Sequence, residues 1–384
     1  MAIFEFLGNI LTSVLIGYLA FTNTVAHEIQ LFFNSDSKQV IVASESHESP
    51  LNTLEKIVQT TETLSGSVPK ILLEHAEFQR AALYASKRND TEVPPDVSRP
   101  LRDTIKDALV NIYCQYKTDT YIRTTTGTGF FINAKGVILT NAHVAQFLLL
   151  KDGKDSIAST ECVIRTGDPA TAKYKAELLY ISPTWIFENA HVITEETPRG
   201  TGERDYALLY VSKSTDNSPL PAHFPTIQVN STLLSRSTIG KSVLTAGYPA
   251  ESLLRRGADA TLLPVVASTT IGTLYTFGSN YADIFSISES PVGEQGASGG
   301  PIVTTDERDV IGLIVTKGDA RTEGEHSLRA ITLSYVDRTI VEETGFSLLQ
   351  NMQGDIAHRG AIFKKAIVPF LAGILEDKIQ ASES

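Results

Sequence analysis

Three short segments carry side chains that together could hydrolyse an acyl bond. His143 and Asp205 each border a strongly apolar run, and Ser298 lies in a glycine-rich loop. Taken singly, such a histidine is more often a core residue, such an aspartate a strand cap and such a serine part of a turn. Together they supply what a serine nucleophile requires: an imidazole to take its proton and a carboxylate to orient the imidazole. We therefore expect Ser298 to be the nucleophile, His143 the general base and Asp205 its orienting partner.

The glycines around the serine have a predicted role of their own. A sharp turn at Gly296 can direct its N–H and that of Ser298 towards one point, where negative charge would develop on a substrate carbonyl. Gly299 and Gly300 let the backbone pass close to the nucleophile. We expect the amides of Gly296 and Ser298 to form an oxyanion hole.

In their order along the chain, these segments resemble the trypsin-like serine proteases of the chymotrypsin fold. The resemblance rests on Thr-Asn-Ala-His ending at His143, Asp-Tyr-Ala-Leu-Leu starting at Asp205 and Gly-x-Ser-Gly-Gly-Pro around Ser298. Within that family the sequence is most similar to the high-temperature-requirement (HtrA) branch, notably over Gly127–His143. The resemblance covers about residues 108–344. It implies a serine endopeptidase with a double barrel and a site between the two halves, acting in protein quality control or regulated proteolysis.

The resemblance also implies where substrate specificity is set. The base of the primary pocket would be Val292, six residues before the nucleophile. One wall would be a strand made of Leu313, Ile314, Val315 and Thr316. No acidic residue stands at the pocket base, so cleavage after Lys or Arg is disfavoured and a small or medium aliphatic residue is expected. Ala297 stands where digestive relatives carry an aspartate that pairs with a new N-terminus, so activation by that ion pair is not expected.

Short apolar runs separated by Gly and Asp turns dominate the chain from about residue 109 onwards. Runs rich in β-branched and aromatic residues, with no helices between them, predict antiparallel barrels or a sandwich. The predicted fold class is mainly β: a chymotrypsin-like double β-barrel with an N-terminal hydrophobic helix, a helical hairpin and a C-terminal helix. Strands are expected at Ala108–Tyr116, Gly129–Asn133, Val137–Asn141, Cys162–Arg165, Ala207–Val211, Lys241–Ala246, Val265–Thr276, Asp283–Ser288, Pro301–Thr305, Val310–Thr316 and Leu328–Leu333.

The N-terminal segment, residues 1–26, predicts membrane targeting. Residues 6–26 hold no charged side chain, and Leu7–Phe21 is dominated by large apolar residues. Such a helix can cross a hydrocarbon layer of about 30 Å. Small residues at Thr24–Ala26 would suit a signal peptidase, but an uncleaved anchor fits equally well. No Lys or Arg precedes the segment, so its orientation is not indicated.

The remaining chain divides into three parts. Residues 27–100 predict a helical spacer and linker, with a second helix starting at about Pro69. Residues 101–345 form the expected protease domain. Residues 346–384 form a C-terminal tail in which Ala361–Leu375 predicts an apolar helix too short to span a bilayer. We expect it to pack on the barrel or on an N-terminal helix, in preference to a contact with a membrane surface. With only about forty residues after the protease domain, we expect no PDZ domain, which HtrA proteases usually carry.

Composition narrows the range of partners. The 33 Lys and Arg residues face 44 Asp and Glu residues, a formal charge of -11 that argues against a nucleic-acid backbone as main partner. Cys114 and Cys162 are too few for a disulfide scaffold or a four-cysteine zinc site, and one disulfide is left open. We expect no cofactor or metal, protein or peptide substrates, a membrane contact through the N-terminal segment, and a protease domain outside the cytoplasm. A homo-oligomer is left open.

Two alternative interpretations of the fold and function remain open. Gly296–Gly300 also fits the Gly-x-Ser-x-Gly nucleophile elbow of α/β-hydrolases, with Asp337 and His358 following in the required order. That fold needs a helix directly after the serine, whereas Gly-Gly-Pro-Ile-Val starts with helix breakers and resembles a strand. The second alternative is a protease fold kept as a binding or chaperone module, although its triad and oxyanion loop are intact.

Overall fold

The computed structural model describes residues 70–71, 99–117, 122–152, 159–195, 200–250, 261–288, 290–292, 296–317 and 327–383. All of them belong to one compact unit, Gly66–Ser384. The predicted N-terminal apolar helix and nearly all of the helical spacer lie outside the described residues. Among the helices that the structure does describe, none has the length and apolar character needed to cross a membrane.

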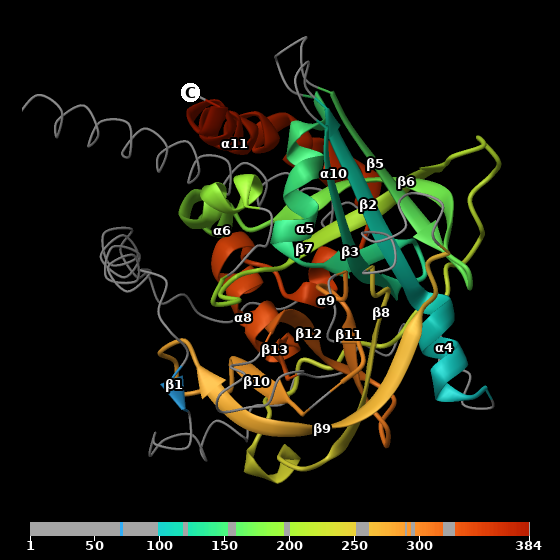
Figure 1. Ribbon diagram of the computed structural model, residues 1–384, viewed down its shortest axis with the longest axis vertical. Helices are drawn as coiled ribbons and strands as arrows, with labels where there is room; N and C mark the ends of the chain where they lie inside the picture. Colours follow the sequence, from blue (N-terminus) through green and yellow to red (C-terminus); the bar gives the residue numbers. More distant parts are fainter. Residues whose placement is uncertain are drawn as a thin grey trace, which may run out of the picture. The chain divides into compact units, whose positions relative to one another are not determined.

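Six antiparallel strands close the first barrel (Figure 1). Neighbours around the ring run in the order β2-β3-β4-β7-β6-β5, so β4 joins β7 across the chain segment that forms β5 and β6. The strands are β2 (Leu109–Lys117), β3 (Ile122–Asn133), β4 (Val137–Thr140), β5 (Ser159–Thr166), β6 (Thr171–Ile181) and β7 (Ala207–Ser214). A disulfide joins Cys114 on β2 to its register partner Cys162 on β5, a pairing that the sequence had left open.

A second ring of six strands closes because β8 pairs with both β9 and β11. Its strands are β8 (Ser242–Gly247), β9 (Val265–Thr276), β10 (Ile284–Ile287), β11 (Pro301–Thr304), β12 (Val310–Lys317) and β13 (Leu328–Thr332). The chain therefore folds as the predicted chymotrypsin-like double β-barrel. The two-residue strand β1 (Lys70–Ile71) pairs with the end of β9. At these two residues the predicted helix from Pro69 is wrong, because their backbone groups pair with β9.

All eleven predicted runs contain strand, but β6 was not predicted, nor was the two-residue strand β1. β6 begins with exposed polar residues and places Lys173, Lys175 and Glu177 at every second position. Its apolar half, Leu178–Ile181, is short. The alternation gives one face to solvent, so the segment lacks the continuous apolar character that marks the buried strands.

Residues that follow one another on the first barrel's strands belong to different apolar clusters. Phe130 and Leu139 lie in a cluster shared with Leu244 and Leu313 of the second barrel. Phe131, next to Phe130, belongs to a cluster formed by the first barrel and the helices beside it. Because side chains alternate across a strand, both faces of these strands are buried, which explains their nearly uninterrupted apolar sequence.

Short helices connect the barrels and cover their outer surfaces. They are α4 (Leu101–Ala108), α5 (Ala142–Ala145), η2 (Gln146–Asp152), α6 (Pro183–Asn189), η3 (Ala190–Thr194), η4 (Arg236–Thr238), α8 (Leu333–Thr344), α9 (Leu348–Asn351), α10 (Ile356–Ala366) and α11 (Val368–Glu383). Helix α8 follows the last strand directly. It starts at the cap residue Thr332, whose hydroxyl accepts a hydrogen bond from the Tyr335 N–H, and ends at Gly345.

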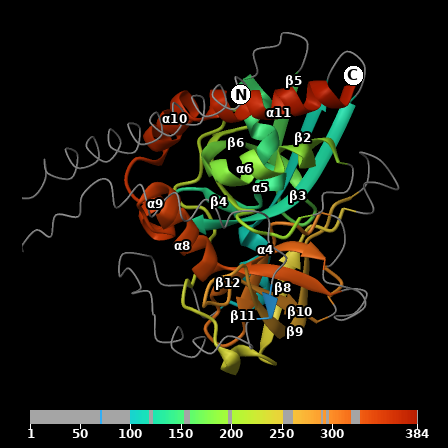
Figure 2. The ribbon, with the colours of Figure 1, turned by 90° about the vertical axis from the view of Figure 1, so that its left-hand side faces the viewer.

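The C-terminal helices pack on the first barrel, as expected, but form two helices rather than one. The predicted helix over Ala361–Leu375 breaks at Ile367, where Pro369 cannot donate a hydrogen bond to the preceding turn. Helix α11 contributes Leu371 and Leu375, both fully buried, to the first barrel's cluster. Figure 2 shows α10 and α11 beside the first barrel and apart from the second.

Candidate active site

The structure joins His143 and Asp205 through two hydrogen bonds. His143 lies on α5, directly after β4, and Asp205 lies two residues before β7. The Nδ1 atom of His143 is 2.7 Å from Oδ2 of Asp205, and the backbone N–H of His143 donates to Oδ1 at 2.9 Å. Because the carboxylate can only accept, Nδ1 carries a proton, which leaves Nε2 as the nitrogen that can take another. The predicted pair of base and orienting carboxylate is therefore in contact.

Further bonds fix the backbone around Asp205. Asn141, the last residue before α5, donates its side-chain N–H to the carbonyl of Asp205 at 2.8 Å. The Asp205 N–H donates to the carbonyl of Gly202 at 3.3 Å. The carboxylate is almost wholly buried, so its position depends on these local bonds rather than on solvent.

Arg204, which the sequence did not single out, ties the same loop to α8. Its guanidinium donates to Glu342 and Glu343, each at 2.8 Å, and its backbone N–H donates to the hydroxyl of Tyr335 at 3.2 Å. Burial lowers the pKa of Arg204, but the neighbouring carboxylates outweigh burial and raise it overall, so the guanidinium stays charged. The residue next to Asp205 thereby connects the first barrel to the helix that follows the second.

The loop of Ser298 packs directly against the first barrel. The carbonyl of Ser298 accepts a hydrogen bond from the N–H of Thr128 on β3, at 2.8 Å. Gly299 has φ +87°, and a Cβ there would lie 2.0 Å from the carbonyl oxygen of Thr128. Only glycine fits at that distance and in that conformation. The predicted reason for a glycine after the nucleophile is thus visible in the contact between the two barrels.

Two hydrogen bonds connect the serine loop to the strand that leads into His143. Thr128 donates to the carbonyl of Ser298, and the hydroxyl of Thr140 donates to the carbonyl of Thr128 at 2.7 Å. Thr140 is the last residue of β4, three positions before His143. Among the described residues, no hydrogen bond joins the Ser298 hydroxyl to the imidazole. Hydrogen bonds of this kind often tighten only when substrate binds.

The two amides predicted to hold an oxyanion belong to the same loop. Gly296 has φ +96°, and its carbonyl accepts a hydrogen bond from the Thr128 hydroxyl at 2.6 Å. In the part of the chain that the structure describes, neither the Gly296 N–H nor the Ser298 N–H donates to a protein acceptor. Both amides are therefore available to a ligand oxygen.

The structure brings only some of the residues predicted for the specificity pocket together: Ile314 shares a cluster with Val292, whereas Leu313 and Val315 belong to another. Val292 is fully buried in the same apolar cluster as Ile314 and Ala297. Leu313 faces the core shared by the barrels, and Val315 packs against Gly202 in the loop before Asp205. The side chain of Thr316 and residues 293–295 and 318–326 lie outside what the structure describes. The pocket itself stays a prediction.

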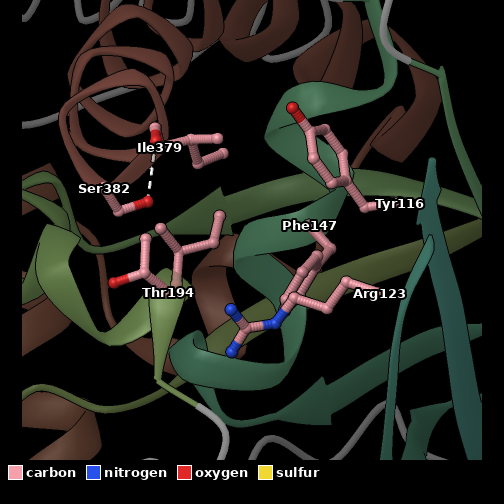
Figure 3. A pocket seen from close by; sticks show the side chains of 7 residues that line it. Tyr116, Arg123, Phe147, Thr194, Ile379 and Ser382 are labelled. Carbon is pink, nitrogen blue, oxygen red and sulfur yellow. Dashed lines mark hydrogen bonds between the residues drawn. The ribbon is translucent and has the colours of Figure 1, made fainter. Parts of the chain in front are cut away.

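A cavity of about 340 Å³ lies elsewhere, between the first barrel and α11 (Figure 3). None of the predicted site residues lines it. The Arg123 guanidinium at its edge donates to the carbonyl of Glu195, and the Ser382 hydroxyl donates to the carbonyl of Ile379. Its lining residues are Tyr116, Arg123, Phe147, Ile193, Thr194, Ile379 and Ser382.

The alternative triad of an α/β-hydrolase does not form. Ser298 is followed by strand β11 instead of a helix. Asp337 lies on α8, where its carboxylate accepts the N–H of Leu348 at 2.7 Å. His358 lies on α10, and its backbone N–H caps that helix on Asp355. The double barrel excludes this reading.

Comparison with known families agrees with the geometry. Residues 127–313 match the model of the trypsin-like peptidase domain. The matched range begins in β3 of the first barrel, ends in β12 of the second and includes His143, Asp205 and Ser298. Among curated proteins, none matches the chain.

Proposed function

We propose, on the premise that residues 127–313 form a trypsin-like peptidase domain, that the protein is a serine endopeptidase acting through His143, Asp205 and Ser298. The observation that carries the proposal is the double hydrogen bond from His143 to the buried carboxylate of Asp205. A structural histidine does not need its ring held in one tautomer, nor does a structural loop need two amides without a protein acceptor among the described residues. A general base for a serine nucleophile needs both.

The proposed reaction uses His143 first as a base and then as an acid in each half-reaction. Nε2 of His143 takes the proton of the Ser298 hydroxyl as its oxygen attacks the peptide carbonyl, and Asp205 stabilises the resulting imidazolium. The amides of Gly296 and Ser298 bind the oxyanion of the tetrahedral intermediate. His143 then protonates the leaving amine, and an acyl-enzyme remains on Ser298. Water, deprotonated by His143, then attacks that ester, and His143 returns the proton to the oxygen of Ser298 as the acid product leaves.

We propose substrates with a small or medium aliphatic residue before the cleaved bond. Val292 at the expected pocket base carries no charge and lies among apolar side chains, which supports this choice over Lys or Arg. Assignment to the HtrA branch, and with it a role in protein quality control or regulated proteolysis, rests on the sequence resemblance alone. The Cys114–Cys162 disulfide favours an oxidising compartment. It is consistent with a protease domain secreted or anchored outside the cytoplasm.

A fluorophosphonate probe tests the proposal without knowledge of the substrate, because it reacts only with an activated serine. The full chain should be labelled, and Ser298→Ala and His143→Ala should not be. Ser237→Ala provides the matched control: Ser237 lies on η4 and bonds only its neighbour Ser235, so labelling should equal that of the wild type. Labelling that persists in Ser298→Ala, or none in the wild type under any condition, would contradict the proposal.

A latent binding or chaperone module is the second candidate. It is favoured by one observation, that no hydrogen bond joins Ser298 to His143 among the described residues. Repeating the labelling with a chemically denatured protein present separates the two. Labelling that appears only with the denatured protein indicates an enzyme activated by substrate. Suppressed aggregation of that protein, with no labelling, indicates a binding module.

A further inference from the structure

Thr128 lies at a buried position where it bonds to the nucleophile loop, to Tyr248 and to the strand that leads into His143. It lies on β3 of the first barrel and is fully buried. Its backbone N–H donates to Ser298, and its carbonyl accepts from the hydroxyl of Thr140. Its own hydroxyl accepts from the N–H of Tyr248 at 2.9 Å and donates to the carbonyl of Gly296 at 2.6 Å. One side chain of the first barrel thus holds two segments of the second.

The direction of the bond to Gly296 is fixed by the other bond of the same hydroxyl. A hydroxyl has one proton to donate and lone pairs to accept. The Tyr248 N–H can only donate, so it occupies a lone pair on the Thr128 oxygen. The proton of Thr128 is then free to point at the Gly296 carbonyl, whose oxygen can only accept. In this hydrogen bond the Thr128 hydroxyl is therefore the donor and the Gly296 carbonyl is the acceptor.

This bond fixes the first of three successive carbonyls in the nucleophile loop. The carbonyl of Gly296 is held by the Thr128 hydroxyl, that of Ala297 by the N–H of Gly300 at 2.9 Å, and that of Ser298 by the Thr128 N–H. In a planar trans peptide the N–H points opposite to the C=O. With the Ala297 carbonyl turned inwards, the Ser298 N–H points away from the protein contacts.

Gly296 is the residue at which this arrangement could fail. At φ +96° it can rotate more freely than any other residue type, and rotation would turn its N–H away from the position of an oxyanion. The Thr128 hydroxyl holds the Gly296 carbonyl, which restricts ψ of Gly296 and the peptide shared with Ala297. The N–H of Gly296 can then turn only through rotation about φ. A Cβ at Gly296 would lie 2.6 Å from the carbonyl of Tyr248, so Gly296 also packs against the segment that binds the same hydroxyl.

We propose that the Thr128 hydroxyl is a positioning group that keeps the oxyanion hole assembled. The inference rests on the proposed function, because the hole matters only if Ser298 attacks a carbonyl. Thr128 does not touch the reacting atoms. It acts through Gly296. A side chain of the first barrel therefore helps to fix the conformation of a loop of the second barrel.

Thr128→Val tests the role of the hydroxyl, because valine keeps the shape of threonine and the backbone bonds to Ser298 and Thr140. Hydrolysis of N-acetyl-alanine p-nitrophenyl ester should show kcat reduced about ten- to a hundredfold with KM within about twofold. This loss is smaller than the 10²–10³-fold cost of deleting an oxyanion donor itself. Thr128→Ser retains the hydroxyl and should restore kcat to within about threefold of the wild type.

Thr126→Val is the matched control on the same strand. The Thr126 hydroxyl accepts a hydrogen bond from Asn111 at 2.8 Å and has no bond to the nucleophile loop. Its kcat should equal that of the wild type. Thermal unfolding of every variant shows whether lost activity merely follows lost fold. If Thr128→Val does not fold, Thr128→Ala against Thr128→Ser gives the same comparison.

The outcomes separate this inference from the proposed function. A wild type without labelling at Ser298 removes the proposed function and the inference with it. A labelled wild type with equal kcat in Thr128→Val, or in Thr128→Ala and Thr128→Ser, overturns the inference alone. So does a loss of kcat that equals the loss of folded protein. A lower kcat in a folded Thr128→Val, restored by serine, supports it.

Discussion

The two barrels contribute to the candidate site in different ways. The first supplies His143 and Asp205, which are joined by side-chain hydrogen bonds on a short helix and a strand end. The second supplies Ser298, whose loop is held by main-chain hydrogen bonds and by glycines that approach Thr128 closely. Side-chain pairing fixes a tautomer, whereas main-chain bonding fixes the direction of amides. The site needs both, and the Thr128 hydroxyl adds a side-chain bond from the first barrel to the loop of the second.

Removing the nucleophile should have the largest effect on this arrangement. Ser298→Ala is expected to reduce turnover by about 10⁶-fold, because the base and carboxylate of the first barrel cannot act without it. Steady-state hydrolysis of a peptide or ester substrate measures the loss. Thermal unfolding should be unchanged, since the Ser298 side chain makes no hydrogen bond among the described residues. Turnover within a hundredfold of the wild type would remove Ser298 from its role.

Changing the first barrel's carboxylate should cost less. Asp205→Asn keeps the shape but offers an N–H in place of one acceptor, which favours the wrong tautomer of His143. We expect kcat to fall about 10⁴-fold while the fold is retained. Asp216→Asn, at an exposed turn in which the carboxylate bonds only Ser218, is the matched control and should leave kcat unchanged. Equal turnover in both variants would mean that His143 does not depend on Asp205.

A methyl group at the contact between the barrels should displace the loop of Ser298, which main-chain hydrogen bonds hold in place. Gly299→Ala places a Cβ 2.0 Å from the Thr128 carbonyl, so the loop must move and Ser298 with it. We expect kcat reduced about 10³-fold and unfolding free energy lowered by about 3 kcal/mol. Gly240→Ala isolates the cost of the backbone conformation: Gly240 has φ +80° but nothing within 4 Å. It should lose about 1 kcal/mol and no activity.

A buried ion pair of the second barrel should affect stability more than activity. The Asp283 carboxylate is buried and accepts from Thr276, Phe277 and Ser279 as well as from Arg338 on α8. Burial raises the pKa of Asp283, and Arg338 acts against that rise. Arg338→Leu should therefore raise the pKa further.

The sign of the pH dependence follows from that shift. A carboxyl whose folded pKa exceeds its unfolded value binds its proton better when folded, so stability falls as pH rises between the two values. Arg338→Leu should cost about 3 kcal/mol at pH 7 and less at pH 4, because the cost shrinks as Asp283 takes up a proton. Urea unfolding at both pH values measures this. Lys241→Leu, which breaks an exposed pair with Asp306, should change stability by less than about 0.5 kcal/mol at either pH. A cost for Arg338→Leu that does not vary with pH would contradict the argument.

The sequence was sufficient to predict the candidate site residues whose chemistry depends on their side-chain type. His143, Asp205 and Ser298 carry distinctive chemistry and stand beside strands whose apolar runs are easy to see. The same runs predicted antiparallel barrels or a sandwich, and the resemblance to chymotrypsin-fold proteases predicted the double barrel. Strand β6 was missed because charged residues stand at every second position of its first half, so only its last four residues look like a strand.

The residues that position the candidate catalytic groups could not be recognised from the sequence in the same way. Thr128 stands in a Gly-Thr-Gly segment, and nothing in its type shows that it faces the nucleophile loop. That contact exists only because β3 and the loop meet where the two barrels join. Nothing in the sequence around Arg204 likewise indicates that it bonds to Glu342 and Glu343, which lie on the distant helix α8. Such roles arise from contacts between distant segments, which one sequence does not encode in readable motifs.

The packing of α11 has a consequence for how the protein is made. The strands of the first barrel are complete at Ser214, but Leu371, Leu375 and Ile379 of α11 fill part of their apolar cluster. The whole second barrel is translated in between. On the ribosome, the half of the molecule that holds His143 therefore waits with an uncovered apolar surface until a much later segment emerges. Assembly of the histidine half is thus coupled to synthesis of the serine half, and an incomplete chain is a candidate for chaperone binding rather than for premature activity.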